Sequence, residues 1–480
     1  MPALRPYLDG NWAPVLDELV VEDLAIHGSL PPELSGTFLR IGPNPRFAAP
    51  GRYHWFDGDG MVHAVTLDGG RAAYRNRFVR TRGLEIEERA GHAIWNGVME
   101  PPQADLPPQS EFIRIKKNVA NTACVFHAGR LLALWDTGEP YELDPVTLAT
   151  RGPYTFGGRL PFPVASHSKV DPITSELIML GGSMKRPAVQ HAVVGPDGAL
   201  GPVTTVALPR TVWMHDFAIT ESSSIFFDLP ARFEPRRIAE GASPYRFDPT
   251  LPSRYGVMPR HGSAGDVQWF EGPPCFIVHT MNAYDAGDEI VLVGVRAEDA
   301  EVGFGDSGPT YRSTTLLHEW RFNRRTGAVR ERQLDNQRIE FAKIDPRRVG
   351  RPNRFGYAGR LAERPPYESD GRIYMMDGIC KYDLVEHTVR FHAFGDQCFG
   401  GDPEFVPRPG ATAEDDGWLL VLVHDEARGV SSLRVCDARD PAAPPMATIA
   451  MPRRVPYGVH STWLSERDLT SATPPVTPSA

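Results

Sequence analysis

Four histidines of this chain stand at the ends of strand-like, apolar segments, in the contexts PFPVASHSKVDP, TVWMHDFAIT, CFIVHTMNAYD and VPYGVHSTWL; they are His167, His215, His279 and His460. Neutral imidazole is the commonest protein ligand for a transition metal. Four imidazoles as the whole ligand set, without a thiolate or a carboxylate, suit iron, copper or zinc better than magnesium or calcium. The pattern therefore predicts one metal ion that is held by histidine alone.

The segments that must position these histidines are typical of short strands. Apolar runs bounded by Gly, Pro, Asp or Asn recur along the chain, and long amphipathic helices are scarce. The 45 glycines and 46 prolines indicate many tight turns. The clearest runs are 129–135, 175–183, 223–230, 275–280, 288–295, 371–378 and 417–425.

A degenerate repeat links many of these strands: a strand end, then Asp or Asn, a turn, and another strand. Because Asp and Asn cap their own turns and Pro pre-sets φ, each copy predicts a hairpin. Hairpins across a whole chain favour an all-β fold of the β-propeller type, with a pair of β-sandwiches as the alternative. The copies are YELDPVTLATR (141–151), SKVDPITSELI (168–178), RFNRRTGAVRER (321–332) and KYDLVEHTVRF (381–391).

The spacing of the histidines agrees with a propeller. His215 follows His167 by 48 residues, and His279 follows His215 by 64 residues. These gaps are near one blade of ~40–50 residues plus an insertion. His460 comes 181 residues after His279. In a closed ring the late blades return beside the early ones, so inner strands can aim all four imidazoles at one point on the axis.

Five longer motifs carry a resemblance to a known family: TFLRIGPNPRF (37–47), YHWFDGDGMVHAV (53–65), KNVANTACVFHAGRLLALWD (117–136), GGDPEFVPR (400–408) and VPYGVHSTWL (455–464). Together they resemble the carotenoid cleavage oxygenases over nearly the whole chain. The resemblance implies a seven-bladed β-propeller with a cap of loops and short helices over the metal face. It also implies one non-haem Fe(2+) per subunit, with O2 as co-substrate, and cleavage of a conjugated carbon–carbon double bond.

The resemblance assigns roles to particular residues. His167, His215, His279 and His460 match the iron ligands. Family members commonly orient three of these ligands with glutamates; the matching residues here are Asp136, Glu340 and Asp402. Aspartate is one methylene shorter, so we expect an inward backbone shift, a bridging water or a less firmly held histidine at two positions. Thr122, in NVANTACV, matches a family threonine beside the open coordination position.

Several other residues have a plainer interpretation. The remaining eleven histidines, among them His54, His63, His127 and His424, lie near turns or strand edges, and we expect them to be structural or solvated. The FDGDG segment (56–60) is acidic, but it lacks the further oxygen ligands of a calcium loop. A turn between strands is therefore the preferred interpretation.

The residue before the first orienting acid bears on the substrate. Phenol-cleaving relatives often have a lysine there, whereas this chain has Trp135, whose apolar ring suits a small apolar polyene. Segments 355–359 and 454–463 also look like those of plant-type members. We therefore expect a carotenoid or apocarotenoid substrate, with stilbenoid or phenylpropenoid cleavage as the alternative. An isomerase or hydrolase of a retinoid-like ester and a non-catalytic, metal-bearing propeller are further alternatives.

Composition narrows the setting in which the protein works. A net charge of −9 argues against nucleic acid as a partner, because phosphate binding needs Lys and Arg. The five scattered cysteines show no CxxC spacing and fit a reducing compartment, so we expect a cytoplasmic protein. No secretory signal or membrane span is indicated. Apolar residues in AIWNGVMEPP (93–102) raise the possibility of weak, peripheral membrane contact.

Domain limits follow from the same composition. Residues 1–468 contain no linker-like segment, and we expect them to form a single β-propeller domain. The Ser/Thr/Pro-rich residues 469–480 are expected to be a disordered tail. The sequence does not indicate an oligomeric state.

Overall fold

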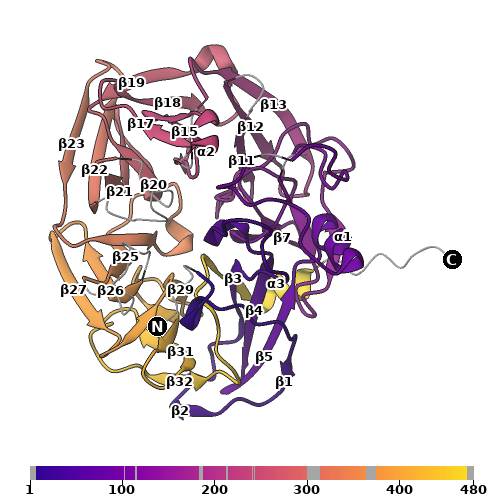
Figure 1. Ribbon diagram of the computed structural model, residues 1–480. Helices are drawn as coiled ribbons and strands as arrows, with labels where there is room; N and C mark the ends of the chain where they lie inside the picture. The colour runs from indigo at the N-terminus through magenta and orange to yellow at the C-terminus, as the bar shows by residue number, and fades with distance from the viewer. Residues whose placement is uncertain are drawn as a thin grey trace.

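The computed structural model describes residues 7–101, 103–113, 116–182, 187–211, 214–240, 242, 244–299, 314–363 and 375–472. Within these residues the strands form antiparallel blades arranged as a ring, which Figure 1 shows along its axis. The strand pairing resolves into seven blades, because the ten-stranded sheet joins two of them through one bridge between β26 and β28. The predicted seven-bladed, all-β propeller is thus confirmed.

Blades 1 to 4 follow one another around the ring in chain order, and β33 from the end of the chain joins blade 1. Blade 1 contains β1 (Val20–Val21), β3 (Gly36–Pro43), β4 (Gly60–Asp68), β5 (Arg71–Phe78) and β33 (Ser461–Ser465). Blade 2 contains β6 (Ala123–His127), β7 (Arg130–Leu134), β8 (Tyr141–Leu143) and β9 (Thr150–Pro153). Blade 3 contains β10 (Lys169–Val170), β11 (Leu177–Gly182), β12 (Ala188–Val194) and β13 (Leu200–Ala207). Blade 4 contains β14 (Ala218–Ile219), β15 (Ser223–Asp228), β18 (Ser253–Pro259) and β19 (Gln268–Gly272).

Blades 5 to 7 complete the ring. Blade 5 contains β20 (Phe276–Ala286), β21 (Glu289–Ala297), β22 (Thr315–Asn323) and β23 (Val329–Gln333). Blade 6 contains β24 (Ile339–Lys343), β25 (Phe355–Leu361), β26 (Met376–Asp383) and β27 (Thr388–Ala393). Blade 7 contains β28 (Cys398–Gly400), β29 (Glu404–Pro407), β30 (Gly417–Asp425), β31 (Val430–Asp437), β32 (Ala447–Ala450) and β2 (Ile26–Gly28).

Strands from both ends of the chain close the ring. β33, near the C-terminus, pairs with β3 in blade 1, with Leu39 opposite Thr462. β2, near the N-terminus, pairs with β32 in blade 7, with Ile26 opposite Ile449. Because each end completes a blade begun by the other end, the first and last blades are tied together by backbone hydrogen bonds.

Position within a blade explains the residue pattern of each strand. β30 (GWLLVLVHD) is buried along almost its whole length, since blades pack against both of its faces. The outer strand β23 instead reads VRERQ, and its charged side chains protect an exposed sheet edge. The inner strands of neighbouring blades contact one another, as β33 contacts β6 and β20 contacts β24.

The predicted hairpins are confirmed, and the same turn chemistry recurs in all four. Each pairs two consecutive strands: β8 with β9, β10 with β11, β22 with β23, and β26 with β27. At each turn the Asp or Asn side chain accepts hydrogen bonds from backbone N–H groups two and three residues ahead. The capping residues are Asp144, Asp171, Asn323 and Asp383.

Helices are short and lie outside the blades. α1 (Arg82–Ala90) begins at Thr81, whose hydroxyl accepts from Leu84 N, and ends at Gly91 with φ of 77°. α2 (Arg236–Ala239) lies between β16 (Ala231–Phe233) and β17 (Tyr245–Phe247), an excursion of blade 4 that Figure 1 shows near the hub. The 3-10 helices are η1 (Gly10–Trp12), η2 (Trp55–Asp57), η3 (Ala264–Asp266) and η4 (Pro346–Arg348).

Two predictions need adjustment. α3 (Glu466–Ser471) extends into the expected tail, because Ser465 and Asp468 cap it reciprocally, so residues 469–471 are helical. Residues 473–480 lie outside the described residues, as do residues 371–374 of the predicted run 371–378.

In the segment 93–102, Trp95 and Met99 are buried, so these side chains form no exposed apolar patch. Among the described residues, no helix is long and apolar enough to cross a membrane.

Candidate metal centre

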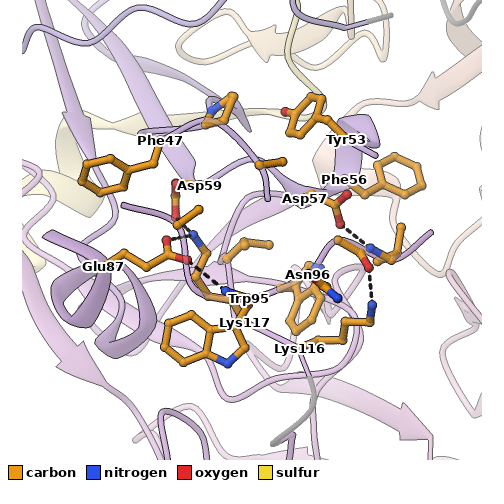
Figure 2. Close-up of a pocket in the computed structure, with 17 residues that line it drawn as sticks. Phe47, Tyr53, Phe56, Asp57, Asp59, Glu87, Trp95, Asn96, Lys116 and Lys117 are labelled. Carbon is orange, nitrogen blue, oxygen red and sulfur yellow. Dashed lines mark hydrogen bonds and ion pairs between the residues drawn. The ribbon is translucent and has the colours of Figure 1, made fainter. Parts of the chain in front are cut away.

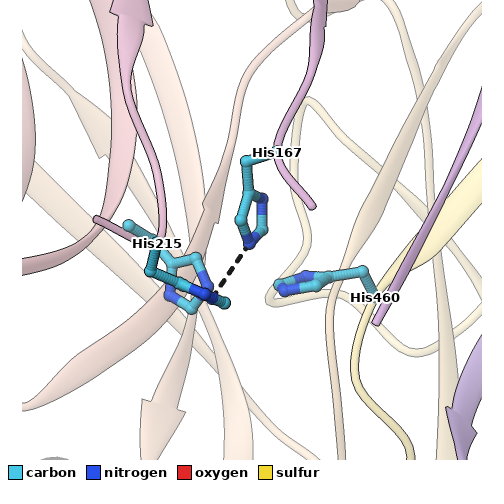
Figure 3. A group of neighbouring side chains, drawn as sticks. His167, His215 and His460 are labelled. Atoms are coloured by element: carbon cyan, nitrogen blue, oxygen red, sulfur yellow. Dashed lines mark hydrogen bonds between the residues drawn. The ribbon is translucent and has the colours of Figure 1, made fainter. Parts of the chain in front are cut away.

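The ring brings the four predicted histidines to one point at its hub. His460 directly precedes β33, His167 and His215 precede β10 and β14, and His279 lies within β20. All four therefore come from the inner strands of their blades or from the residues just before them. One ring nitrogen from each imidazole lies within 4.8 Å of the corresponding nitrogen of every other. Figure 3 shows His167, His215 and His460 pointing toward a common centre.

The spacing of the nitrogens fits a single ion. His167 Nε2 and His215 Nε2 are 3.1 Å apart. Two ligands at right angles around an ion, each with a metal–nitrogen bond of ~2.1 Å, lie ~3.0 Å apart, and opposed ligands lie ~4.2 Å apart. The Nε2 atoms of His279 and His460 are buried and have no hydrogen-bond partner among the described residues. Buried nitrogens without partners are costly, so the centre is built for a cation that these lone pairs can bind.

Asp136 orients His215 at close range. Its Oδ2 accepts from His215 Nδ1 at 2.6 Å, although aspartate is shorter than the family glutamate. The other oxygen, Oδ1, accepts from Ser166 N at 3.1 Å and from Ser166 Oγ at 2.5 Å. Asp136 follows β7 in the loop that enters the hub, and Ser166 fixes it there. A carboxylate can only accept, so the His215 proton sits on Nδ1 and Nε2 keeps its lone pair for a metal.

Glu340 orients His279 in the same way. Its Oε2 accepts from His279 Nδ1 at 2.7 Å, and both side chains are buried. Glu340 lies in β24, whose pairing with β25 is irregular between Glu340 and Lys343. Within this bulge Phe341 has φ of 55°, and its ring packs edge-on against His279 and His460 at 5.2 and 4.8 Å between centroids. The bulge thus aims one side chain at His279 and places an apolar wall beside two ligands.

Asp402 contacts His460 more weakly. Its Oδ2 lies 3.4 Å from His460 Nδ1, compared with 2.6 and 2.7 Å at the other two acid–histidine pairs. The same oxygen accepts from Ser461 N at 2.8 Å and lies 3.2 Å from Lys343 Nζ. Lys343 also donates to Glu404 Oε2 at 2.9 Å. Of the effects expected from a shorter acid, the less firmly held histidine therefore occurs at Asp402 and not at Asp136.

The charges of the centre follow from burial and pairing. Burial opposes ionisation of Asp402, but Lys343, together with hydrogen bonds from His460 and Ser461 N, outweighs it and lowers the pKa of that carboxyl. Burial lowers the pKa of His460 to about 3, against the pull of Asp402. Burial also lowers the pKa of His167, and the other three imidazoles lower it further. These imidazoles are thus neutral near pH 7, the form in which histidine binds metals.

A cavity of about 260 Å³ lies beside the histidines and is lined by residues of the inner strands. Its charged residues form two groups. Lys169 lies 2.7 Å from Asp216, whose Oδ2 accepts from the backbone and hydroxyl of Thr280, next to His279. Lys343 pairs with Asp402 and Glu404. The cavity thus combines these paired charges with apolar side chains such as Ile219, Phe341 and Phe405.

Sequence reasoning did not single out Lys169, Asp216 or Lys343. Each carries a usable signal, since it is a charged residue in or beside a segment that otherwise reads as a buried inner strand. Asp216 directly follows His215, and Lys343 lies three residues after Glu340. Buried charges are rare unless they are paired, so such residues indicate a functional or strongly constrained position.

Thr122 and Trp135 lie near the centre on blade 2. Thr122 directly precedes β6, and its hydroxyl donates to Asn121 Oδ1 at 3.0 Å. Its role beside an open coordination position stays a prediction. Trp135 adjoins Asp136 and lines a small cavity of about 40 Å³, together with Tyr53 and Phe56. Figure 2 shows aromatic rings and charged side chains alternating around this cavity.

The acidic FDGDG segment lies in the wall of this small cavity and is engaged by protein donors. Asp57 accepts from the backbone N–H groups of His54 and Val98 at 2.9 and 2.7 Å, and burial raises its pKa to about 6. Asp59 Oδ1 lies 2.7 Å from Lys117 Nζ, which also donates to Glu87. The preferred interpretation as a turn is supported, since η2 and a chain turn precede β4 here.

The other named histidines have structural partners. His54 accepts from Phe56 N in the cap of η2, and His63 Nδ1 lies 2.7 Å from the Tyr74 hydroxyl. His127 forms a hydrogen bond with Ser175 O, and His424 forms one with Ser431 Oγ. None of these contacts includes the four-histidine centre.

Fold and centre together define a β-propeller with a four-histidine site at its hub that can hold a metal. The sequence matches the profile of the family described as retinal pigment epithelial membrane protein over residues 12–465. The carotenoid 9,10(9′,10′)-cleavage dioxygenase 1 of Arabidopsis thaliana is 36% identical over 502 aligned residues, which cover 97% of this chain and 91% of that protein. The chain therefore belongs to the carotenoid cleavage oxygenase family.

Solved structures agree with this membership. Lignostilbene dioxygenase of Pseudomonas brassicacearum superposes with a TM-score of 0.86 at 28% identity, covering 96% of this chain and 98% of that one. Cobalt-substituted apocarotenoid oxygenase of Synechocystis superposes with a TM-score of 0.83 at 30% identity, covering 94% and 97%. The resemblance stated from the sequence motifs is thus confirmed.

Proposed function

We propose that this protein is an iron(II)-dependent dioxygenase that cleaves one conjugated double bond of a carotenoid or apocarotenoid. One molecule of O2 is consumed for each bond, and one oxygen atom enters each of two carbonyl products. The observation that carries the proposal is the cluster of four imidazoles with orienting acids, at the hub of a chain 36% identical to a plant carotenoid-cleaving dioxygenase. Iron(II), when bound, supplies the redox-active centre that this reaction requires.

The residues of the chain contribute positioning and shielding. Asp136 and Glu340 hold the protons of His215 and His279 on Nδ1, which leaves each Nε2 free to bind the ion. Neutral imidazoles leave the full charge of the ion uncompensated. Burial of the centre within the ring excludes bulk water from it. None of these residues needs to donate or remove a proton from the substrate in the cleavage itself.

The nature of the substrate is argued from Trp135. Trp135 directly precedes Asp136 and contributes an apolar ring to the wall of the small cavity, a surface that suits a polyene better than a charged group. A stilbenoid substrate is the second candidate, because a lignostilbene dioxygenase shares the fold with a TM-score of 0.86 and because Tyr53, Lys116 and Lys117 line the same cavity. A non-catalytic role fits poorly with relatives that are named as dioxygenases.

Anaerobic loading with iron(II), followed by carotenoids, apocarotenoids and stilbenes in parallel, tests the proposal. We expect turnover of a polyene only after O2 is admitted, with label from ¹⁸O2 in both carbonyl products. Turnover of an ester without O2 would instead indicate an isomerase or hydrolase. Absence of O2-dependent cleavage with every polyene, in protein shown to contain iron, would refute the proposal.

We also propose a cytoplasmic location and weak contact with membranes that hold the substrate. The location is inferred from the five scattered cysteines, and the membrane contact from the apolar substrate and not from segment 93–102, in which Trp95 and Met99 are buried. Flotation with liposomes measures the membrane contact directly. Recovery of all protein in the soluble fraction, with and without a polyene in the vesicles, would contradict it.

A further inference from the structure

We propose that Lys343 is a positioning residue that holds the Asp402 carboxylate in place beneath His460. The inference rests on the proposed metal-binding role of His460. It concerns one ligand of the four, because Asp402 is the acid whose contact with its histidine is longest.

The geometry around Asp402 shows how the lysine acts. Asp402 Oδ2 meets three donors: His460 Nδ1 at 3.4 Å, Ser461 N at 2.8 Å and Lys343 Nζ at 3.2 Å. The second oxygen, Oδ1, is buried and has no partner among the described residues. His460 is therefore held by a shared oxygen of a short side chain, and the other two contacts decide where that oxygen lies.

Lys343 is itself anchored. Its ammonium donates to Glu404 Oε2 at 2.9 Å and to Ser461 O at 3.2 Å, so it bridges β24 to β29 and β33. Ser461 follows His460 directly, and Lys343 follows Glu340 by three residues. One lysine thus connects the backbone beside His460 with the strand that carries the acid of His279.

The buried carboxylate of Asp402 needs the positive charge of Lys343 beside it. The Asp402 side chain is fully buried, and a buried carboxylate without a countercharge is strongly destabilised. Without Lys343, Asp402 and Glu404 would face each other as two acids in one cavity. Asp402 would then turn away from Glu404, and His460 would lose the acceptor that fixes its ring.

Cobalt(II) binding tests the inference without relying on turnover. The variants are Lys343→Met, Lys343→Arg, Lys343→Met combined with Asp402→Glu, and the control Lys381→Met. Lys381 is a buried lysine of the same blade that pairs with Asp415 at 2.6 Å, remote from the centre. The measurements are the ligand-field absorption of bound cobalt(II), its rate of release to a chelator, and the thermal midpoint of the metal-free protein.

We expect Lys343→Met to release cobalt(II) ~10–100-fold faster than the wild type, as loss of an outer hydrogen-bond partner typically does. Lys381→Met should lower the thermal midpoint but keep the wild-type absorption and release rate. Lys343→Arg, which retains the charge, should recover slow release, whereas the combined variant should not, because Glu404 and the new acid still lack a countercharge. Wild-type release from Lys343→Met, or no recovery with Lys343→Arg, would overturn the inference. Wild-type protein that binds no cobalt(II) would instead overturn the proposed metal centre itself.

Discussion

At the scale of single residues, two aspartates of the same length behave differently. Asp136 reaches His215 at 2.6 Å because Ser166 holds its second oxygen and the loop after β7 enters the hub. Asp402 stays 3.4 Å from His460, although Ser461 N and Lys343 hold the same oxygen beside that imidazole. The length of a side chain alone therefore does not set its reach, because the position of the backbone also contributes.

Lengthening Asp136 should weaken metal binding. In Asp136→Glu the added methylene must fit into a contact that is already formed, and overpacking a buried site costs ~1–3 kcal/mol. We expect faster cobalt(II) release than in the wild type. Asp402→Glu should act in the opposite direction, because there the contact is too long. Release rates measured side by side check both, and equal shifts in the same direction would contradict the contrast.

Trp135→Lys should shift substrate preference. The change replaces an apolar ring with an ammonium at the position where phenol-cleaving relatives carry lysine, next to Asp136. We expect the ratio of kcat/KM for a hydroxystilbene over that for an apocarotenoid to rise ~10-fold or more, since a charged hydrogen bond contributes ~1.5–3 kcal/mol. Trp135→Phe is the control that keeps the apolar surface. An unchanged ratio in Trp135→Lys would remove Trp135 as a specificity residue.

At the scale of elements, the capped hairpin is the unit that the chain repeats. Asn323 only caps its own turn, through Arg325 N and Thr326 N. Asp171 caps its turn in blade 3 and also pairs with Arg260 at 2.7 Å and Arg351 at 3.3 Å, which belong to blades 4 and 6. The same turn chemistry is thus used locally in one blade and to tie blades together in another.

Removing these two caps should have unequal costs. Asn323→Ala loses turn hydrogen bonds worth ~1 kcal/mol. Asp171→Ala also removes the nearer of two carboxylates that pair with the buried guanidinium of Arg260 and leaves Glu176 at 3.4 Å, and breaking such a buried pair costs up to ~3–5 kcal/mol. Urea midpoints of the metal-free variants measure the difference. Similar midpoints for the two variants would show that the inter-blade pairs contribute little.

At the scale of the whole molecule, buried neutral histidines couple the stability of the ring to pH. Burial lowers the pKa of His63 to about 3 and that of His191 to about 4. Both lie outside the metal centre, His63 against Tyr74 and His191 against Ser224. In the unfolded chain each titrates near 6.5, so the unfolded state takes up protons first as the pH falls.

The free energy of unfolding should therefore decrease as the pH falls below about 6.5. The stabilising contribution of each neutral histidine is complete above pH 6.5 and is lost as the pH falls toward the folded-state pKa, by ~1.4 kcal/mol per pH unit for one proton. His63→Gln, which can still accept from Tyr74, should flatten the slope of unfolding free energy against pH by about one proton between pH 6 and ~4. Denaturant titration of metal-free protein measures it, and an unchanged slope would contradict the buried neutral state.

Features that depend on residue type and short spacing could be predicted from the amino-acid sequence alone. The four histidines, the family motifs and the Asp- or Asn-capped hairpins are local features, because an imidazole at a strand end or a side chain that caps its own turn needs no distant neighbour. The family resemblance carried by these motifs assigns roles to four further residues, which are Thr122, Asp136, Glu340 and Asp402. Family membership and the propeller could therefore be predicted before any coordinates.

Distances between residues far apart in the chain depend on the tertiary structure and could not be read from the sequence. Asp136 bonds His215 across 79 positions, and Lys343 reaches Ser461 across 118, through ring closure by β33. No local pattern distinguishes a firm acid contact at His215 from a loose one at His460. That difference arises because hydrogen-bond strength changes over fractions of an ångström, whereas residue spacing along a strand is fixed only in steps of ~3.3 Å.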